Sequence, residues 1–277
     1  MEQTKLQELK RIAANVRLGA LECVYSAASG HPGGALSIAD ILTYLYFAHM
    51  HIDPKNPTWS ERDRFVLSKG HTCPALYAVL AEKGYFPKAD LKTFRQIDSY
   101  LQGHPDMKHT PGVDMTTGSL GLGISAACGI ALSGKIDRKT YRVYSILGDG
   151  EVEEGQVWEA AMFAAHYQLD NLCAFVDVNG LQIDGPTEKV MNSAPLCDKF
   201  RAFGWHTIDI DGHDFEQIAA ALQEAGQTVG QPTMILAKCV KGKGVSFMEN
   251  QVGWHGKAPK QEEYEQAVAE IKAAAGL

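Results

Sequence analysis

The sequence predicts an α/β fold in which a mostly parallel sheet carries helices on both faces. Two observations support this fold class. Strand-like and helix-like stretches alternate along the 277 residues, which is the order of a parallel sheet covered by helices. The predicted strands are short and almost continuously apolar, as expected where both faces of a sheet are covered. No internal repeat or low-complexity segment interrupts the alternation.

The first half of the chain begins with helical patterns and contains one short strand. Helices are expected at residues 4–29, 37–51 and 74–83, and the strand "RFVLS" at residues 64–68 precedes the third helix. A long polar stretch follows at residues 98–117. Its Gly and Pro residues predict an irregular loop.

The second half is more regular and supplies most of the predicted sheet. Strands are expected at residues 141–147, 171–178, 205–210 and 233–239. Helices are expected at residues 121–133, 156–167, 196–203 and 215–225. The final stretch, "PKQEEYEQAVAEIKAAAGL", is typical of a solvated terminal helix. We therefore expect one large domain at residues 1–257 and a helical tail at residues 258–277.

Composition limits the classes of partner. The formal net charge is −7, so a general nucleic-acid surface or an anionic membrane surface is not expected. The first residues form a charged helix without the apolar core of a secretory signal. No run approaches the roughly 18 apolar residues of a membrane span. The cysteines stand singly, without a CxxC pair, at positions 23, 73, 128, 173, 197 and 239. They predict reduced packing residues in a cytoplasmic protein.

Two polar residues follow neighbouring predicted strands. Asp149 comes after "YRVYSIL" and Asn179 comes after "NLCAFVDV", with a helix between the two strands. A strand–helix–strand unit has parallel strands, so both residues are expected at the carboxyl-end edge of the sheet, where open α/β sheets bind ligands. A carboxylate, an amide oxygen and a freed backbone carbonyl are hard ligands that suit Mg²⁺ or Ca²⁺. The sequence therefore predicts a metal that holds a diphosphate.

These residues also carry a resemblance to a known family. "GDG" followed by Asn179, 30 positions after Asp149, resembles the thiamin diphosphate signature, and "NGLQIDG" resembles the transketolases in particular. Further motifs resemble that family in the same order: "SGHPGG", "LSKGHTCPALYAVLAEKG", "GHPD", "TGSLGLG" and "PTMILAKCVKGKG" leading to "GWHGKAP". "GHPD" has Asp where many members have Glu, and Leu181 stands where Ile is common.

The resemblance implies a role for each matched residue. The implied metal ligands are Asp149, Asn179 and the Leu181 carbonyl. The implied contacts to thiamin diphosphate are His71, Gly118, Leu120, Gly148, Asp149, Gly150, Asn179, Lys238 and His255. The implied substrate contacts are His31, His104 and His255. The implied catalytic residues are His31, His71, His104, His255, Glu154 and Glu159, the two glutamates lying at a subunit interface. Glu151, Glu153, Lys241 and Lys243 are expected to be solvated, and the other six histidines to be surface or structural.

The resemblance also implies an activity and a partner. The activity is that of a transketolase, a transferase of carbohydrate metabolism and the pentose phosphate pathway that moves a two-carbon ketol unit from a ketose or its phosphate to an aldose or its phosphate. The sequence contains no match to the family's second domain, which carries the Glu that binds the pyrimidine ring. We therefore expect a separate C-terminal subunit, an α2β2 heterotetramer, and activity only when both subunits are present.

Two alternatives stay open, and a third does not fit the sequence. The first is the diphosphate-binding part of a deoxyxylulose-phosphate synthase or of a two-subunit 2-oxoacid dehydrogenase. The second is a non-catalytic homologue that binds thiamin diphosphate. The third, a nicotinamide-binding domain, requires G-x-G-x-x-G after a first strand, which "GDGEVEEG" does not match. The sequence does not identify the two sugars or decide between Mg²⁺ and Ca²⁺.

Overall fold

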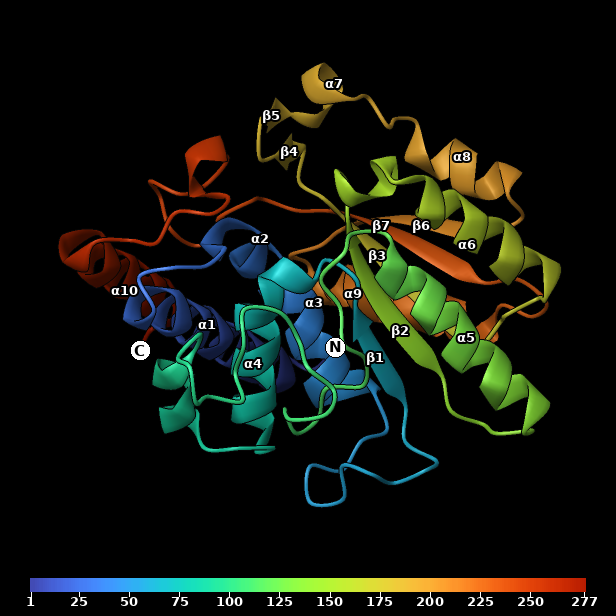
Figure 1. Cartoon of the computed structure of the whole chain (residues 1–277), viewed down its shortest axis with the longest axis horizontal. Coiled ribbons are helices and arrows are strands. Elements are labelled where there is room, and N and C mark those ends of the chain that lie inside the picture. The colour runs from blue at the N-terminus through green and yellow to red at the C-terminus, as the bar shows by residue number, and fades with distance from the viewer.

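A five-stranded sheet organises the chain, and the computed structural model describes all residues, 1–277. Every strand pair in this sheet is parallel, and the strand order is β1-β2-β3-β7-β6 (Figure 1). The strands are β1 (Arg64–Leu67), β2 (Val143–Gly148), β3 (Leu172–Val178), β6 (His206–Asp211) and β7 (Thr233–Lys238). The predicted fold class is confirmed.

Both faces of β1, β2, β3 and β7 are buried, which explains their continuous apolar runs, whereas the edge strand β6 is mostly half-buried. Successive side chains of a strand point to opposite faces. On β3, Cys173 and Phe175 therefore join one hydrophobic cluster, whereas Ala174 and Val176 join another.

Two helical layers cover these faces. The first cluster includes residues of α1 (Gln3–Ser26), α3 (Ala39–Tyr44), α4 (Cys73–Lys83) and α9 (Phe215–Gln227). The second includes residues of α5 (Leu122–Ile136), α6 (Gly155–His166) and α8 (Leu196–Ala202). Figure 1 shows α5 and α6 side by side on one side of the sheet and α1, α3 and α4 on the other. None of the helices has the length and apolar character that crossing a membrane requires.

The predicted helix at residues 37–51 is wrong in its extent. The chain instead forms α2 (Pro32–Ser37), then α3, then a π-helical turn at Leu45–His49. Pro32 occupies the first turn of α2, where its fixed φ and missing N–H are tolerated. The backbone leaves the helical region at Ile38, with φ −99° and ψ 3°. This break separates α2 from α3.

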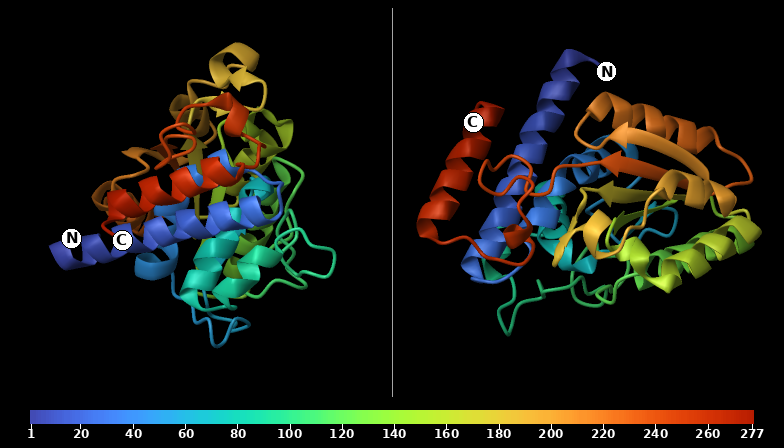
Figure 2. Two further views of the ribbon diagram at one scale, coloured as in Figure 1. Left: turned by 90° about the vertical axis from the view of Figure 1, so that its left-hand side faces the viewer. Right: turned by 90° about the horizontal axis from the view of Figure 1, so that it is seen from above.

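The expectation of a solvated terminal helix is also wrong in part. α10 (Gln261–Ala275) lies along α1 in both views of Figure 2. Its Ala267 and Ile271 are buried in a third cluster with Leu21 and Trp254. One stripe of α10 is therefore packed, and only its other faces are solvated.

The order in which the chain adds strands to the sheet changes after β3. After β3 the chain passes through β4 (Leu181–Gln182), β5 (Gly185–Pro186), α7 (Thr187–Val190) and α8 to reach β6 at the edge. It then returns through α9 to β7, which pairs with β3. The crevice outside the carboxyl ends of strands at such a switch point is the usual ligand site of an open α/β sheet.

Gly123 allows the start of α5 to approach the end of β1. A Cβ added at this position would lie 2.5 Å from the Ser68 Cα. We expect Gly123→Ala to lower the free energy of unfolding by about 1 to 3 kcal/mol through overpacking.

Gly129 serves as the control, because it lies in the same helix with no atom within 4 Å of an added Cβ. We expect Gly129→Ala to raise the free energy of unfolding by up to about 1 kcal/mol, because Ala favours a helix. Urea denaturation measures both, and equal effects would contradict this account.

Candidate active site

Asp149 and Asn179 lie beside each other at the carboxyl edge of the sheet, as the strand–helix–strand argument predicts. Gly148 is the register partner of Asp177, which places the residues that follow β2 and β3 together. The Gly180 N–H donates to Asp149 Oδ2 at 2.5 Å, and the Leu181 N–H donates to Asn179 Oδ1 at 3.1 Å. These bonds hold a carboxylate, an amide oxygen and the turn after β3 within one small space.

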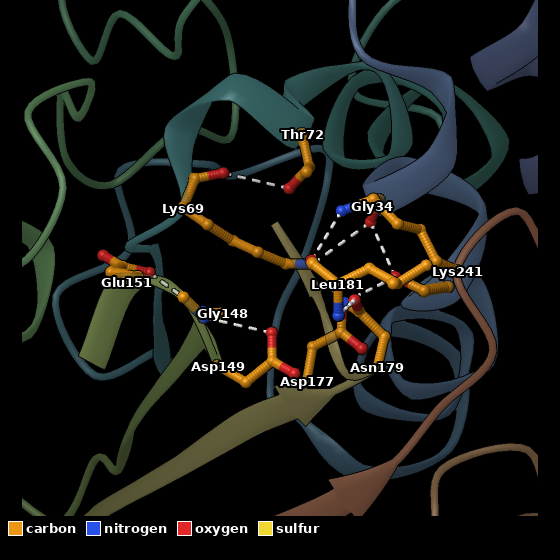
Figure 3. Close-up of polar contacts among 12 residues, drawn as sticks. Gly34, Lys69, Thr72, Gly148, Asp149, Glu151, Asp177, Asn179, Leu181 and Lys241 are labelled. Atoms are coloured by element: carbon orange, nitrogen blue, oxygen red, sulfur yellow. Dashed lines mark hydrogen bonds and ion pairs between the residues drawn. The ribbon is translucent and has the colours of Figure 1, made fainter. Parts of the chain in front are cut away.

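A buried ion pair joins β1 to β3 behind these residues. Lys69 Nζ donates to Asp177 Oδ2 at 2.5 Å and to the Gly34 carbonyl at 3.1 Å. Asp177 Oδ2 also accepts from the Ser37 hydroxyl at 2.6 Å and from Asn179 Nδ2 at 2.9 Å. Burial alone would raise the pKa of Asp177, but the Lys69 charge and these donors outweigh burial and lower the pKa. Figure 3 shows the extended Lys69 side chain crossing toward Gly34.

Lys69 and Asp177 were not predicted from the sequence. An acid inside the apolar strand "LCAFVDV" was the available signal, because a charged residue is almost never fully buried unless it is paired.

Lys241 brings a second cation into the site. Its side chain is 3% exposed, and its Nζ donates to the Leu181 carbonyl at 2.8 Å and lies 3.1 Å from His255 Nδ1. Burial and repulsion by Lys69 lower the pKa of Lys241 to about 8 against the attraction of Asp177 and Asp149. The expectation that Lys241 is solvated is therefore wrong, because the β7 exit loop turns its side chain inward.

Lys238, which the resemblance places near the cofactor, is exposed at the end of β7. Its register partners are Val178 and Asp211. Its role in binding stays a prediction.

The donor set around Asp149 fits a divalent cation. Asp149 is 4% exposed, and burial, followed by repulsion from Asp177, raises its pKa to about 6. A cation at this position would relieve that destabilised carboxylate. The Leu181 carbonyl already accepts from a cation, the ammonium of Lys241. A carboxylate, an amide oxygen and a carbonyl are the ligand types that Mg²⁺ and Ca²⁺ prefer.

Three of the four predicted histidines form a compact group. The ring centroids of His31, His71 and His255 lie 5.1 to 5.5 Å apart. Burial and neighbouring positive charges lower the pKa to about 4 for His31, about 2 for His71 and about 3 for His255. All three rings are therefore neutral near pH 7 and able to donate and accept hydrogen bonds. The Nδ1 of His31 is buried without a hydrogen-bond partner, which leaves it available to a ligand.

His104 lies at the edge of this group. An added Cβ on Gly118 would meet the His104 ring at 3.4 Å, so the Gly-rich loop and the "GHPD" loop are adjacent. The Tyr77 hydroxyl donates to the carbonyls of Gln102 and His104 at 2.8 and 3.0 Å. Burial, and then the positive charge of Arg95, lower the pKa of His104. The role of His104 in binding the substrate stays a prediction.

Glu151 is buried, so the expectation that it is solvated is wrong. It is 3% exposed. Its Oε1 accepts from the Ser68 hydroxyl at 2.6 Å and the Gly121 N–H at 2.9 Å, and its Oε2 accepts from the Gly148 N–H at 3.0 Å. Burial outweighs these donors and raises the pKa of Glu151. Glu151 thus ties the β1 end, the Gly-rich loop and the Gly148 turn together.

The other predicted residues lie around this centre. Glu154 is exposed at the N-cap of α6, Glu159 is exposed within α6, and Leu120 is half-buried. An added Cβ on Gly150 would lie 2.7 Å from Gln182 Oε1, so this turn lies directly against the Gln182 side chain.

The raised pKa of Asp149 predicts a pH dependence of stability in the cofactor-free chain. The unfolded carboxyl ionises near its ordinary pKa of 3.8 and the folded one near 6. The protonated acid therefore stabilises the fold below the lower value, and this contribution is lost as pH rises through about 6. We expect the stability difference between the native chain and Asp149→Asn to fall by about 2 kcal/mol between about pH 4.5 and 7.5.

Urea denaturation in EDTA at both pH values measures this difference. Asp184→Asn, at an exposed position, serves as the control and should show no such pH dependence. A pH-independent difference for Asp149→Asn would contradict the assignment.

Comparisons with known proteins identify the family of the chain. Residues 8–277 match the family described as "Transketolase, thiamine diphosphate binding domain". The chain is 50% identical over 265 residues to the 6-deoxy-6-sulfo-D-fructose transketolase subunit SqwG of Clostridium sp. (strain MSTE9), and the match covers 96% of each chain. It is 42% identical to an apulose-4-phosphate transketolase subunit from Phocaeicola vulgatus, over 91% of this chain and 89% of that protein.

Solved structures and longer relatives give the same result. Transketolase from Campylobacter jejuni superimposes with a TM-score of 0.91 at 35% identity, over 100% of this chain and 43% of that chain. Mouse transketolase is 46% identical over 98% of this chain and 43% of its own length. The chain thus spans less than half of these relatives but nearly the whole of SqwG. The chain belongs to the transketolase family, in which it matches the thiamine diphosphate binding domain.

Proposed function

We propose that this chain binds thiamin diphosphate with a divalent cation and is the N-terminal subunit of a transketolase. Together with a partner chain it would transfer a two-carbon ketol unit from a ketose to an aldose. One set of contacts supports the proposal: Asp149 and Asn179 both accept from N–H groups of the turn after β3, and Lys241 joins the Leu181 carbonyl of that turn to His255.

The charges of the site support the binding of a diphosphate with its metal. In the ligand-free chain two buried lysines, Lys69 and Lys241, face two buried aspartates, Asp149 and Asp177. We infer that Asp149, Asn179 and Leu181 hold the cation and that Lys241 lies beside the diphosphate. A divalent cation offsets most of the negative charge of a diphosphate, so the metal and the phosphates together change the buried charge little.

The histidines supply hydrogen bonds and proton acceptors. Thiamin diphosphate, when bound, provides the electron sink that cleavage of a ketose carbon–carbon bond requires. We infer that His31, His104 and His255 bind the hydroxyls of the sugar and that His71 contacts the cofactor. Because their pKa values are lowered, the rings are neutral near pH 7 and can accept a hydrogen bond from a hydroxyl.

We propose a separate partner chain that carries the pyrimidine-binding Glu and forms an α2β2 assembly with this chain. The names of SqwG and of the apulose-4-phosphate protein describe each as a subunit, and this chain matches both over most of their length. Glu154, at the N-cap of α6, and Glu159, within α6, are exposed, which suits a contact with another chain. We place residues 1–257 in the diphosphate-binding domain and 258–277 in a helical tail.

The cysteines are free and all but Cys197 are buried, which supports a reducing, cytoplasmic location.

The sugars of SqwG and its relative carry anionic groups by name, a sulfo group in one and a phosphate in the other. We therefore propose an anionic ketose as the donor substrate, with a phosphate as the default.

Purification of the tagged chain from its host, followed by an assay of the chain and its co-purifying partner, tests the function. With thiamin diphosphate and Mg²⁺ we expect ketol transfer that needs both chains. Condensation with pyruvate and release of CO₂ would indicate the deoxyxylulose-phosphate synthase alternative. Full activity of this chain alone would contradict the requirement for a partner.

The proposed metal site predicts a large effect of one substitution. We expect Asp149→Ala to lower ketol transfer by the assembled pair by more than about 100-fold, because loss of a ligand weakens metal binding at least as much as loss of a supporting residue. The exposed Asp184→Ala variant should retain activity. Unchanged activity of Asp149→Ala would exclude Asp149 as a metal ligand.

The position of His104 predicts a separate effect on the substrate. We expect His104→Ala to raise the KM for the donor ketose about tenfold, through the loss of hydrogen bonds to a hydroxyl, while the affinity for thiamin diphosphate stays the same. His109→Ala serves as the control, since His109 lies in the same loop but is exposed and pairs with Asp106. A loss of cofactor affinity without a change in KM would place His104 at the cofactor instead.

A further inference from the structure

The segment that delivers Lys241 leaves the sheet just after β7. The Cys239 N–H donates to the Val178 carbonyl at 3.0 Å, continuing the pairing of β7 with β3. The Gly242 N–H donates to the Gly33 carbonyl at 2.9 Å. Between them, the Val240 N–H has no backbone acceptor and donates to the side chain of His213, at Nε2, over 2.9 Å.

His213 connects this amide to a buried ion pair. Its Nδ1 lies 2.7 Å from Asp40 Oδ2. Arg17 holds the same carboxylate with two guanidinium nitrogens, at 3.1 Å to Oδ1 and 2.5 Å to Oδ2. Arg17 and Asp40 are 8% and 6% exposed. Because Nε2 accepts from Val240, the proton of the neutral ring is on Nδ1, where Asp40 accepts it.

This connection crosses three parts of the fold. Arg17 belongs to α1, Asp40 to α3, and His213 to the turn between β6 and α9. A buried ion pair is weak support for stability alone, because desolvation of its charges offsets much of the attraction. Its placement suits a fixed anchor for the imidazole, which would otherwise rotate about its side-chain bonds.

The anchored amide belongs to the residue before Lys241. Lys241 Nζ reaches the Leu181 carbonyl at 2.8 Å and His255 Nδ1 at 3.1 Å, so a shift of the backbone at Val240 moves both contacts. Figure 3 shows the Lys241 side chain directed toward Leu181 from the far side of the site.

We propose that His213 is a positioning residue that fixes the backbone of Val240 through the Arg17–Asp40 ion pair and thereby places Lys241 in the site. The placement of the backbone is supported by the hydrogen bonds from Val240 to His213 and from His213 to Asp40. Its consequence for cofactor binding rests on the proposed function.

Hydrogen exchange of the cofactor-free full chain tests the placement without any ligand. His213→Asn keeps a donor at the Nδ1 position but removes the acceptor for Val240, whereas His213→Gln offers an amide oxygen near the Nε2 position. We expect the asparagine variant to speed exchange of the Val240 amide about tenfold and the glutamine variant to restore most of the protection. His206→Asn, which alters a half-exposed histidine paired with Glu224, should leave Val240 unchanged.

Equal exchange in the native chain and the asparagine variant would overturn the proposal. An equal increase in both His213 variants would also overturn it, since the ring would then act only by filling space. If the asparagine variant does not fold, ¹⁵N NMR of the native chain determines the tautomer of His213 and thus whether Nε2 can accept from Val240. The Nδ1–H form supports the proposal, and the Nε2–H form overturns it.

A titration with thiamin diphosphate and Mg²⁺ then tests the consequence. We expect His213→Asn to bind the cofactor about fivefold more weakly than the native chain, the value of one hydrogen bond of about 1 kcal/mol, and His213→Gln to bind nearly as tightly. A native chain and partner that bind no cofactor would contradict the proposed function and leave the exchange result standing. Native-like affinity of His213→Asn, with faster exchange, would overturn the link between Val240 and the cofactor.

Discussion

The Lys69–Asp177 ion pair is the interaction on which the site depends. Asp177 lies inside β3 and is completely buried, where an unpaired charge would cost several kcal/mol. Lys69 extends from the end of β1 to neutralise it, and the same ammonium binds the Gly34 carbonyl of α2. Asp177 in turn orients Asn179 and binds Ser37. The pair therefore joins β1, β3 and α2 at the edge where the predicted ligands meet.

Around this pair lie a second buried acid and a second buried lysine, Asp149 and Lys241, and a group of neutral imidazoles. Asp149 is destabilised as an anion and Lys241 as a cation, so each favours a partner of opposite charge. Burial, followed by nearby positive charges that include Lys69 or Lys241, lowers the pKa values of His31, His71 and His255. The lysines that suit a diphosphate thus also contribute to keeping the adjacent histidines neutral.

Sequence reasoning located the residues whose position follows from topology. Asp149 and Asn179 meet because parallel strands place their carboxyl ends together, and the histidine motifs match a known order. Lys241 and Glu151 were missed because their burial depends on loops that fold back over the sheet, and no local pattern distinguishes them from solvated residues. The break at Ile38 was missed for a similar reason, since Ser37 is held by Asp177, which lies 140 residues away. Local periodicity carries no information on such contacts.

A crystal structure of the chain and its partner grown with thiamin diphosphate and Mn²⁺ tests the central claim most directly, through the anomalous signal of the metal. The account predicts one anomalous peak bonded to Asp149, Asn179 and the Leu181 carbonyl at about 2.0 to 2.6 Å, with the diphosphate on its open side. A cofactor bound at this edge with its metal on other residues, or bound elsewhere, would contradict it.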